Sequence, residues 1–266
     1  MSHHSFNPIT QTPFISEGGE NHDSDYFEAI ASYLQDHSFS AHEALEYWPV
    51  LTRRTSLQRF LALNELLKLT LDVPGDIAEF GVWQGHSLLT WANLLEVYAT
   101  TDRSKEVFGF DTFAGFTSFG EEDGSVGDVQ QRKTLDSFGG ESVYRRLLDA
   151  IELYDMDRFV PWKKRISLIV GDVMETLPKW LSDNQGRRFS LVYLDLDVYE
   201  PTKFVMEQLW DHMPNGAVLA FDEYAKPAWQ GESQAVDEFL RENDLKEALK
   251  KFHWNSSPGA FLVKGS

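Results

Sequence analysis

Two pairs of carboxylates mark the part of this sequence that is best suited to chemistry. Asp195 and Asp197 end the apolar run FSLVYLDLD, and Asp222 and Glu223 end the apolar run GAVLAFDEY. Side chains two residues apart in an extended strand point to the same side, so Asp195 and Asp197 would face one direction. Neighbouring parallel strands lie about 5 Å apart, so acids that end two such strands could meet at one edge of a sheet.

Clustered carboxylates repel one another, and at least one of them must hold a proton unless a positive charge lies nearby. A hard divalent ion such as Mg²⁺ removes that conflict, because it prefers oxygen ligands. No basic residue lies within either pair of acids to supply the charge instead. The alternative is a set of solvated loop acids in a very acidic protein, and we favour the metal site.

A glycine-containing turn follows an earlier apolar run. Residues 79–87 read EFGVWQGHS, with glycines at 81 and 85 that would let the backbone approach a ligand closely. The helix that follows would offer free N–H groups to a carboxylate or phosphate. The spacing is not G-x-G-x-x-G, so the dinucleotide fingerprint is absent. A tight strand-to-helix turn that needs glycine only for its geometry explains the pattern equally well.

Two further aspartates end apolar runs. Asp111 ends the run EVFGFD, where its carboxylate could accept both hydroxyls of a ribose or cap the next segment. Gly171 and Asp172 end the run RISLIVGD. Asp172 could cap the helix expected over residues 174–182 or contact an adenine amino group, and capping is the stronger expectation.

These side chains need elements that hold them at one edge of a sheet. Short runs rich in Val, Ile, Leu and Phe alternate with segments long enough for crossover helices. Strands that are apolar on both faces indicate a parallel sheet covered on both sides, so the predicted fold class is α/β, doubly wound. Ligands of such sheets bind beyond the carboxyl ends of the strands, where the strand order reverses. The predicted strands cover residues 77–82, 106–111, 165–172, 189–197 and 216–224, and the crossover helices include 87–98 and 201–213.

The rest of the chain gives a coarse domain organisation. Residues 1–24 lack apolar periodicity and are expected to form a flexible arm. Apolar residues recur at helical spacing over 25–48 and 55–71, which predicts a helical cap over 25–72 in front of the main domain, 73–266. Within that domain we expect a lid over about 112–141, where six glycines accompany four phenylalanines, a helix over 232–250, and a terminal antiparallel hairpin over 251–264 around a Ser-Ser-Pro-Gly turn.

Composition excludes several classes of function. The 266 residues include no cysteine, which rules out disulfide scaffolds, iron–sulfur clusters and thiol nucleophiles. A formal net charge of −18 argues against binding to nucleic acid or to anionic membranes. No apolar run approaches the roughly 20 residues that a bilayer span requires, and the N-terminus does not read as a signal peptide, so we expect a cytoplasmic protein.

Taken together, the motifs resemble those of class I S-adenosylmethionine-dependent methyltransferases, and among them the macrocin O-methyltransferase family of natural product biosynthesis. The resemblance runs from about residue 57 to 264. It rests on PGDIAEFGVWQGHSL, FGFDTFAGF, LDLDVYEPT, and FDEY followed by QAVDEF, of which LDLDVYEPT is the most specific. The family resemblance implies a seven-stranded sheet with an antiparallel last strand, and suggests a homo-oligomer.

The resemblance also implies roles for individual residues. S-adenosylmethionine would be bound through its methionine part at the 79–87 turn, through its ribose at Asp111, and through its adenine at Asp172. Mg²⁺ would be bound by Asp195, Asp222 and Glu223. From the chemistry of methyl transfer, and not from the resemblance, Asp195 or Asp197 is our candidate for the base. The implied cofactor contacts are Glu79, Phe80, Gly81, Gly85, Ser87, Asp111, Thr112, Gly171, Asp172, Val173 and Asp195.

Two positions depart from the family pattern. The family usually has an aspartate where this chain has Glu223, whose extra methylene could still reach the ion. His86 stands where a glycine is common, and no role is assigned to it.

The expected reaction is methyl transfer to a sugar hydroxyl of a small molecule, a deoxysugar nucleotide or a glycosylated natural product. Coordination to Mg²⁺ would stabilise the alkoxide of this poor nucleophile, and a carboxylate would take the proton. Three alternatives stay open: a phenol or catechol acceptor, a nicotinamide-dependent oxidoreductase, and a non-catalytic binding protein on the same fold. The missing dinucleotide fingerprint and the paired acids disfavour the oxidoreductase.

Overall fold

The computed structural model of the protein describes residues 19–124, 138–245 and 249–266. The chain divides into two compact units, residues 1–57 and 58–266. The boundary between the units falls inside one helix, so the cap expected from the sequence is shared between them.

The first unit consists of one long helix followed by shorter ones. Ser40 and Glu43 form a capping box in which the Ser40 Oγ accepts from the Glu43 N–H at 3.2 Å and the Glu43 carboxylate accepts from the Ser40 N–H at 2.8 Å. A capping box starts a new helix, so the single helix expected over 25–48 is interrupted at this point. The helices are α1 (Gly19–Asp36), α2 (Ala41–Glu46), α3 (Trp48–Leu51) and the beginning of α4 (Arg54–Lys68).

The second unit is built on a six-stranded sheet in the order β3-β2-β1-β4-β5-β6. All neighbouring strands pair in parallel except β5 and β6, which are antiparallel. The strand order reverses between β1 and β4, and the predicted α/β doubly wound fold is confirmed. The strands are β1 (Asp76–Phe80), β2 (Val107–Asp111), β3 (Ile166–Val170), β4 (Phe189–Leu194), β5 (Val218–Phe221) and β6 (Ala260–Val263).

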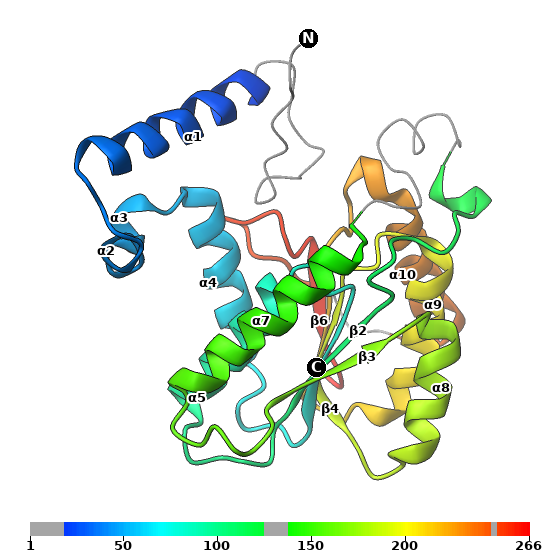
Figure 1. Ribbon diagram of the computed structural model, residues 1–266. Coiled ribbons are helices and arrows are strands. Elements are labelled where there is room, and N and C mark those ends of the chain that lie inside the picture. The colour runs from blue at the N-terminus through cyan, green and yellow to red at the C-terminus, as the bar shows by residue number, and fades with distance from the viewer. Residues whose placement is uncertain (1–18, 125–137, 246–248) are drawn as a thin grey trace. The chain divides into compact units, whose positions relative to one another are not determined.

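Helices cover both faces of the sheet (Figure 1). One apolar core packs α4, α5 and α7 against the sheet, and a second packs α8, α9 and α10 against the other face. Because both faces are covered, the central strands β1, β4 and β5 are buried along their whole length. The remaining helices are α5 (His86–Tyr98), η1 (Glu121–Asp123), α7 (Glu141–Asp157), α8 (Val173–Asp183), α9 (Tyr199–Leu209), η2 (Trp210–His212), η3 (Pro227–Trp229) and α10 (Gln230–Glu242).

The end of the chain differs from the expected hairpin. The described residues supply six strands where the family resemblance implied seven, because the first arm of the hairpin contributes only an isolated bridge from Lys250 to Phe261. The segment before β6 instead turns toward the end of β5: the Gly259 N–H donates to the carbonyl of Phe221 at 2.9 Å. This detour brings Ser257 to the carboxyl end of the sheet.

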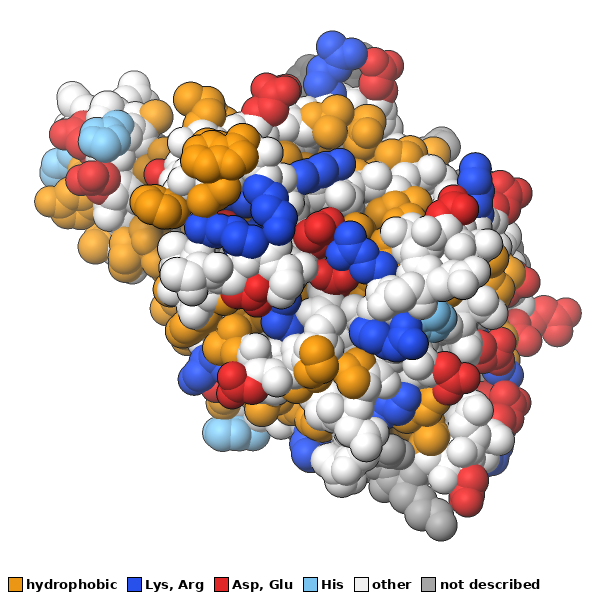
Figure 2. Space-filling model, turned by 90° about the horizontal axis from the view of Figure 1, so that it is seen from below, with side chains coloured by type: hydrophobic (Ala, Val, Ile, Leu, Met, Phe, Trp, Pro, Cys, Tyr) orange, Lys and Arg blue, Asp and Glu red, His pale blue; other side chains and the backbone are white. Residues whose placement is uncertain are grey.

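The surface carries both signs of charge despite the acidic composition. Figure 2 shows Lys and Arg side chains interspersed with Asp and Glu on the face that it presents. Among the described residues, no helix combines the length and apolar character that a membrane span requires.

Candidate active site

The turn after β1 and the loop after β4 touch at the point where the strand order reverses. Gly81 has a φ of +86°, and a β-carbon on it would lie 1.9 Å from the carbonyl oxygen of Asp195. The Asp195 N–H donates to the carbonyl of Phe80 at 2.8 Å. Only glycine fits this position, because both its backbone conformation and its close contact exclude a side chain.

Substitution of Gly81 by Ala should therefore disturb the site directly. We expect a loss of about 2 kcal/mol in the free energy of unfolding, from the unfavourable φ and the displaced Asp195 carbonyl. We also expect weaker binding of S-adenosylmethionine, measured by calorimetry beside urea unfolding. Gly186→Ala is the matched control, since no atom lies within 4 Å of a β-carbon there. Equal behaviour of the two variants would contradict the close contact.

Glu79 is fully buried at the end of β1. Its Oε1 accepts from the Ser87 hydroxyl at 2.6 Å, while its Oε2 is buried with no hydrogen-bond partner among the described residues. Burial raises the pKa of Glu79 well above its usual value. An unpaired buried oxygen is costly, so this side chain is suited to receive a donor from a ligand.

Asp111 holds the turn together through its carboxylate. Its Oδ2 accepts from the N–H groups of Val82 at 2.7 Å and Trp83 at 2.8 Å, and its Oδ1 accepts from Phe113 at 2.6 Å. Burial raises the pKa of Asp111, and these three bonds oppose the shift. The hydroxyl of the adjacent Thr112 donates to the carbonyl of Gly115. Asp111 thus has a structural role of its own, because its hydrogen bonds connect the carboxyl ends of β1 and β2.

Asp172 caps α8, as expected from its position. Its Oδ1 accepts from the Met174 N–H at 2.8 Å, and the preceding Gly171 has a φ of +134°. Val173 is buried in the apolar core beside them. These residues lie at the carboxyl end of β3, two strands away from β1.

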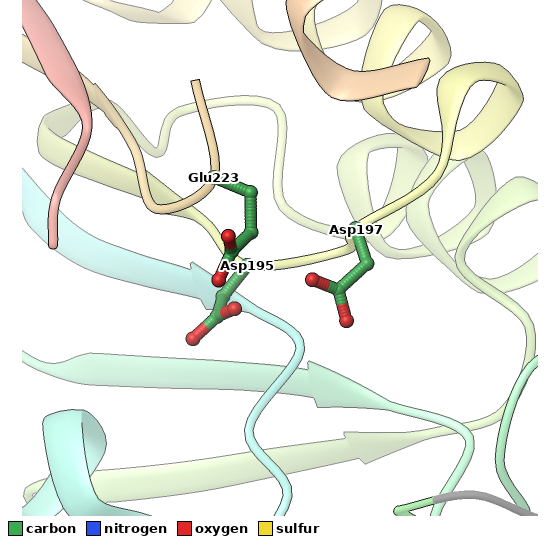
Figure 3. A group of neighbouring side chains, drawn as sticks. All are labelled: Asp195, Asp197 and Glu223. Atoms are coloured by element: carbon green, nitrogen blue, oxygen red, sulfur yellow. The ribbon is translucent and has the colours of Figure 1, made fainter. Parts of the chain in front are cut away.

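Three carboxylates converge at the ends of β4 and β5 (Figure 3). Asp195, Asp197 and Glu223 each place one oxygen within 4.8 Å of the other two. Asp197 adopts a left-handed φ of +68°, which costs energy and is typical of functional loops. Glu223 reaches the group through its longer side chain, so its departure from the family pattern does not remove it from the cluster.

Asp222, which was expected in this cluster, has other partners. It accepts from the Arg59 guanidinium at 2.9 Å, from the Ser257 hydroxyl at 2.5 Å and from the Tyr193 hydroxyl. Burial opposes ionisation of Asp222, but the charge of Arg59 outweighs it and holds the pKa of Asp222 well below its usual value. The structure therefore groups Asp197, rather than Asp222, with Asp195 and Glu223.

Two basic residues outside the acidic pairs supply positive charge that the residues within the pairs do not. Arg59 of α4 lies 3.2 Å from an Asp195 oxygen, and Lys226 lies 3.0 Å from Glu223. These two cations face a larger number of acids, which include the fully buried Glu232. Glu232 accepts from the Glu223 N–H at 2.7 Å. The two cations therefore neutralise only part of the negative charge, and the pKa values of the acids are expected to rise as a result.

The pKa values of Asp195, Glu223 and Glu232 are all raised. Burial, followed by the charge of Asp222, raises the pKa of Asp195 well above its usual value and that of Glu223 to about 9. Burial and Glu223 likewise raise the pKa of Glu232. Protons are thus held where carboxylates crowd together, and a divalent cation could replace them. The oxygen-only donor set of Asp195, Asp197 and Glu223 fits Mg²⁺.

Residues that sequence reasoning missed complete the site. Arg59, Tyr193 and Ser257 surround Asp222 but lie far from it in sequence. His86 is the first residue of α5, and desolvation of its ring, together with the charge of Arg59, lowers the pKa of that ring to about 4. Its imidazole is therefore neutral at pH 7.

The lid expected over 112–141 falls partly outside the described residues. Its described ends place Phe116 and Phe138 with ring centroids 5.9 Å apart. Phe138 also contacts Trp83 at 5.4 Å, and Phe116 contacts Trp229 at 6.3 Å. These rings connect the turn after β1 with the segment after β5.

The family model for macrocin O-methyltransferase (TylF) matches residues 35–258. The chain belongs to the macrocin O-methyltransferase family. It is an O-methyltransferase, and a solved structure of the same fold, an O-methyltransferase from Bacillus cereus, holds SAH.

Individual relatives align with most of the length of this chain. Demethyldecarbamoylnovobiocin O-methyltransferase of Streptomyces niveus is 25% identical, over 91% of this chain and 84% of the relative. Mycinamicin III 3''-O-methyltransferase of Micromonospora griseorubida is 24% identical, over 83% and 84%. The crystal structure of the calicheamicin methyltransferase CalS11 superposes with a TM-score of 0.83 at 31% identity, over 95% of this chain and 96% of that one. CalS11 is named as a TDP-rhamnose 3'-O-methyltransferase in a second solved structure of that enzyme.

Proposed function

We propose that this protein transfers the methyl group of S-adenosylmethionine to a sugar hydroxyl with the help of Mg²⁺. The acceptor would be a small sugar-containing molecule, a deoxysugar nucleotide or a glycosylated natural product. The observation that carries the proposal is the convergence of Asp195, Asp197 and Glu223 beside the Gly81 turn. The names of CalS11 and the mycinamicin enzyme support a sugar acceptor.

The methyl donor would lie across the carboxyl ends of β1, β2 and β3. The turn at Gly81 and Gly85, with the unpaired oxygen of Glu79 and its partner Ser87, would hold the methionine part. Asp111 and Thr112 would border the ribose. The pair Asp172 and Val173, beside Gly171, would border the adenine.

Asp195 and Glu223 would hold the metal ion, and Asp197 would act as the base. Bound Mg²⁺ would lower the pKa of a coordinated sugar hydroxyl. Asp197 accepts the hydroxyl proton while the sugar oxygen forms its bond to the methyl carbon and the bond from that carbon to sulfur breaks. Arg59 and Lys226 orient the carboxylates. Most of the rate enhancement comes from in-line alignment of the sugar oxygen with the methyl carbon and the sulfur.

The direct test is an assay with labelled S-adenosylmethionine. The protein would be incubated with Mg²⁺ and a panel of deoxysugar nucleotides, glycosylated metabolites and catechols, with EDTA and with Mg²⁺ restored. We expect label in a sugar, lost with EDTA and regained with Mg²⁺. Label in a catechol alone would overturn the sugar acceptor, and activity unchanged by EDTA would overturn the metal.

The raised pKa of Glu223 gives a prediction for the metal-free protein. A carboxyl group whose pKa is about 9 in the folded state, against 4.5 ordinarily, binds its proton more tightly when folded. Its contribution to stability is complete below pH 4.5 and is lost as the pH rises toward 9. In EDTA, the melting temperature of the wild type should therefore fall relative to Glu223→Gln between pH 5 and 9, by at least about 5 °C. Parallel melting curves for the two proteins would contradict the assignment.

A further inference from the structure

Asp123 lies in the segment expected to form a lid and outside the family motifs, yet it is buried. It is 6% exposed at the end of η1, in the segment that follows β2. Its Oδ2 accepts from the Gly120 N–H at 2.8 Å, and its Oδ1 accepts from the Tyr199 N–H at 2.7 Å. The second bond spans 76 positions and ends on the first residue of α9.

Helix α9 has no side-chain cap of its own. The residue at its N-cap position is Val198, whose side chain cannot accept a hydrogen bond. The first N–H groups of a helix need acceptors, and a carboxylate is favoured there because it also meets the positive end of the helix dipole. Asp123 supplies that carboxylate from a distant part of the chain.

The loop between β4 and α9 carries the candidate metal ligand Asp195 and the candidate base Asp197. Only residues 195–198 separate β4 from α9. At the start of this loop the Asp195 N–H is bound to Phe80, and at its end the Tyr199 N–H is bound to Asp123. Asp197, in its left-handed conformation, lies between these two fixed points. A strained backbone conformation persists only where the surrounding structure holds it. The bond from Tyr199 to Asp123 therefore helps to fix the backbone of Asp197 and the direction of its side chain.

The start of α10 is shaped to admit Asp123. A β-carbon on Gly231 would lie 1.9 Å from the Asp123 Oδ1 and 2.9 Å from the Tyr199 nitrogen. The neighbouring Gln230 donates to the carbonyl of Glu122 at 3.0 Å. The contact between η1 and the two helices is therefore close and specific.

We propose that Asp123 is a positioning residue that caps α9 and thereby sets the conformation of the loop bearing Asp195 and Asp197. The catalytic part of this inference rests on the proposed function of those two acids. The structural part, the cap itself, does not.

Four variants separate the two parts. Asp123→Ala removes both bonds. Asp123→Asn keeps an oxygen for the Tyr199 N–H but cannot accept from Gly120 as well. Gly231→Ala pushes the carboxylate aside without changing it. Glu121→Ala is the matched control, because it removes an exposed acid of the same 3-10 helix.

Hydrogen exchange of the peptide over residues 195–205 reports on the cap whether or not the enzyme is active. We expect faster exchange in Asp123→Ala and Gly231→Ala, and unchanged exchange in Asp123→Asn and Glu121→Ala. Unchanged exchange in Asp123→Ala would overturn the cap, as would exchange in Asp123→Asn as fast as in Asp123→Ala.

Kinetics and metal binding then test the effect on the loop. For Asp123→Ala and Gly231→Ala, we expect kcat to fall about tenfold and the Kd for Mn²⁺ to rise several-fold, with the KM for S-adenosylmethionine within about twofold. Asp123→Asn should stay within about threefold of the wild type, because the bond to Tyr199 remains. Faster exchange with kcat and the Kd for Mn²⁺ unchanged would limit Asp123 to a structural role and overturn its positioning role. A wild type that binds no Mn²⁺ and methylates no sugar would overturn the proposed function, while the exchange result for the cap would stand.

Discussion

Substitution of Asp195 by Asn is expected to lower kcat at least about 1000-fold, because the amide is a poor ligand for Mg²⁺ and no longer balances Arg59. Affinity for S-adenosylmethionine should change less than about fivefold, since the close contacts between the turn after β1 and Asp195 are made by the Asp195 backbone. Single-turnover methyl transfer and calorimetric titration of the methyl donor would measure the two quantities separately.

Asp183→Asn provides the control for this substitution. Asp183 is an exposed residue at the end of α8, so the same chemical change there should leave both quantities unaltered. If Asp195→Asn lost donor affinity and turnover to the same extent, the residue would serve the donor site rather than the transfer step.

The second large effect concerns the ion pair between α4 and the end of β5. Arg59→Met should lower the free energy of unfolding by about 3 kcal/mol, because it leaves Asp222, whose side chain is 4% exposed, without its nearest cation. Lys226 remains, but at 3.8 Å. Urea unfolding at pH 7 would measure the loss.

Lys68→Met is the matched control on the same helix. Lys68 pairs with Glu65 at 3.0 Å, and both side chains are exposed, so its removal should cost less than about 0.5 kcal/mol. Adding Asp222→Asn to Arg59→Met should restore part of the stability, because it removes the uncompensated charge. If Arg59→Met were as stable as Lys68→Met, the buried pair would not form in solution.

The sheet could be predicted from the sequence because its signals are local. Each central strand is a short apolar run flanked by a turn, and each candidate polar residue directly follows a strand. Parallel strands then bring their carboxyl ends to one edge without further information. The break at Ser40 was also readable, since its capping box with Glu43 is a local pattern that apolar periodicity alone did not include.

The exact membership of the acidic group could not be predicted in this way. Asp222 and Glu223 both lie beyond the end of β5, and each carboxylate has a different nearest cation, Arg59 for Asp222 and Lys226 for Glu223. Which of them meets Asp195 depends on partners that are remote in sequence. Arg59 is 163 residues from Asp222, and nothing in a helical pattern of polar and apolar residues indicates that one arginine points inward.

The placement of Arg59 also bears on how this protein could be recombined with its relatives. The chain divides after Leu57, two positions before the guanidinium that neutralises Asp222. Exchanging the residues before that division keeps Arg59 together with Asp222, because both belong to the second unit. A transplant that begins at β1 instead discards the principal internal counter-ion of Asp222, so hybrid enzymes should be joined ahead of Gln58.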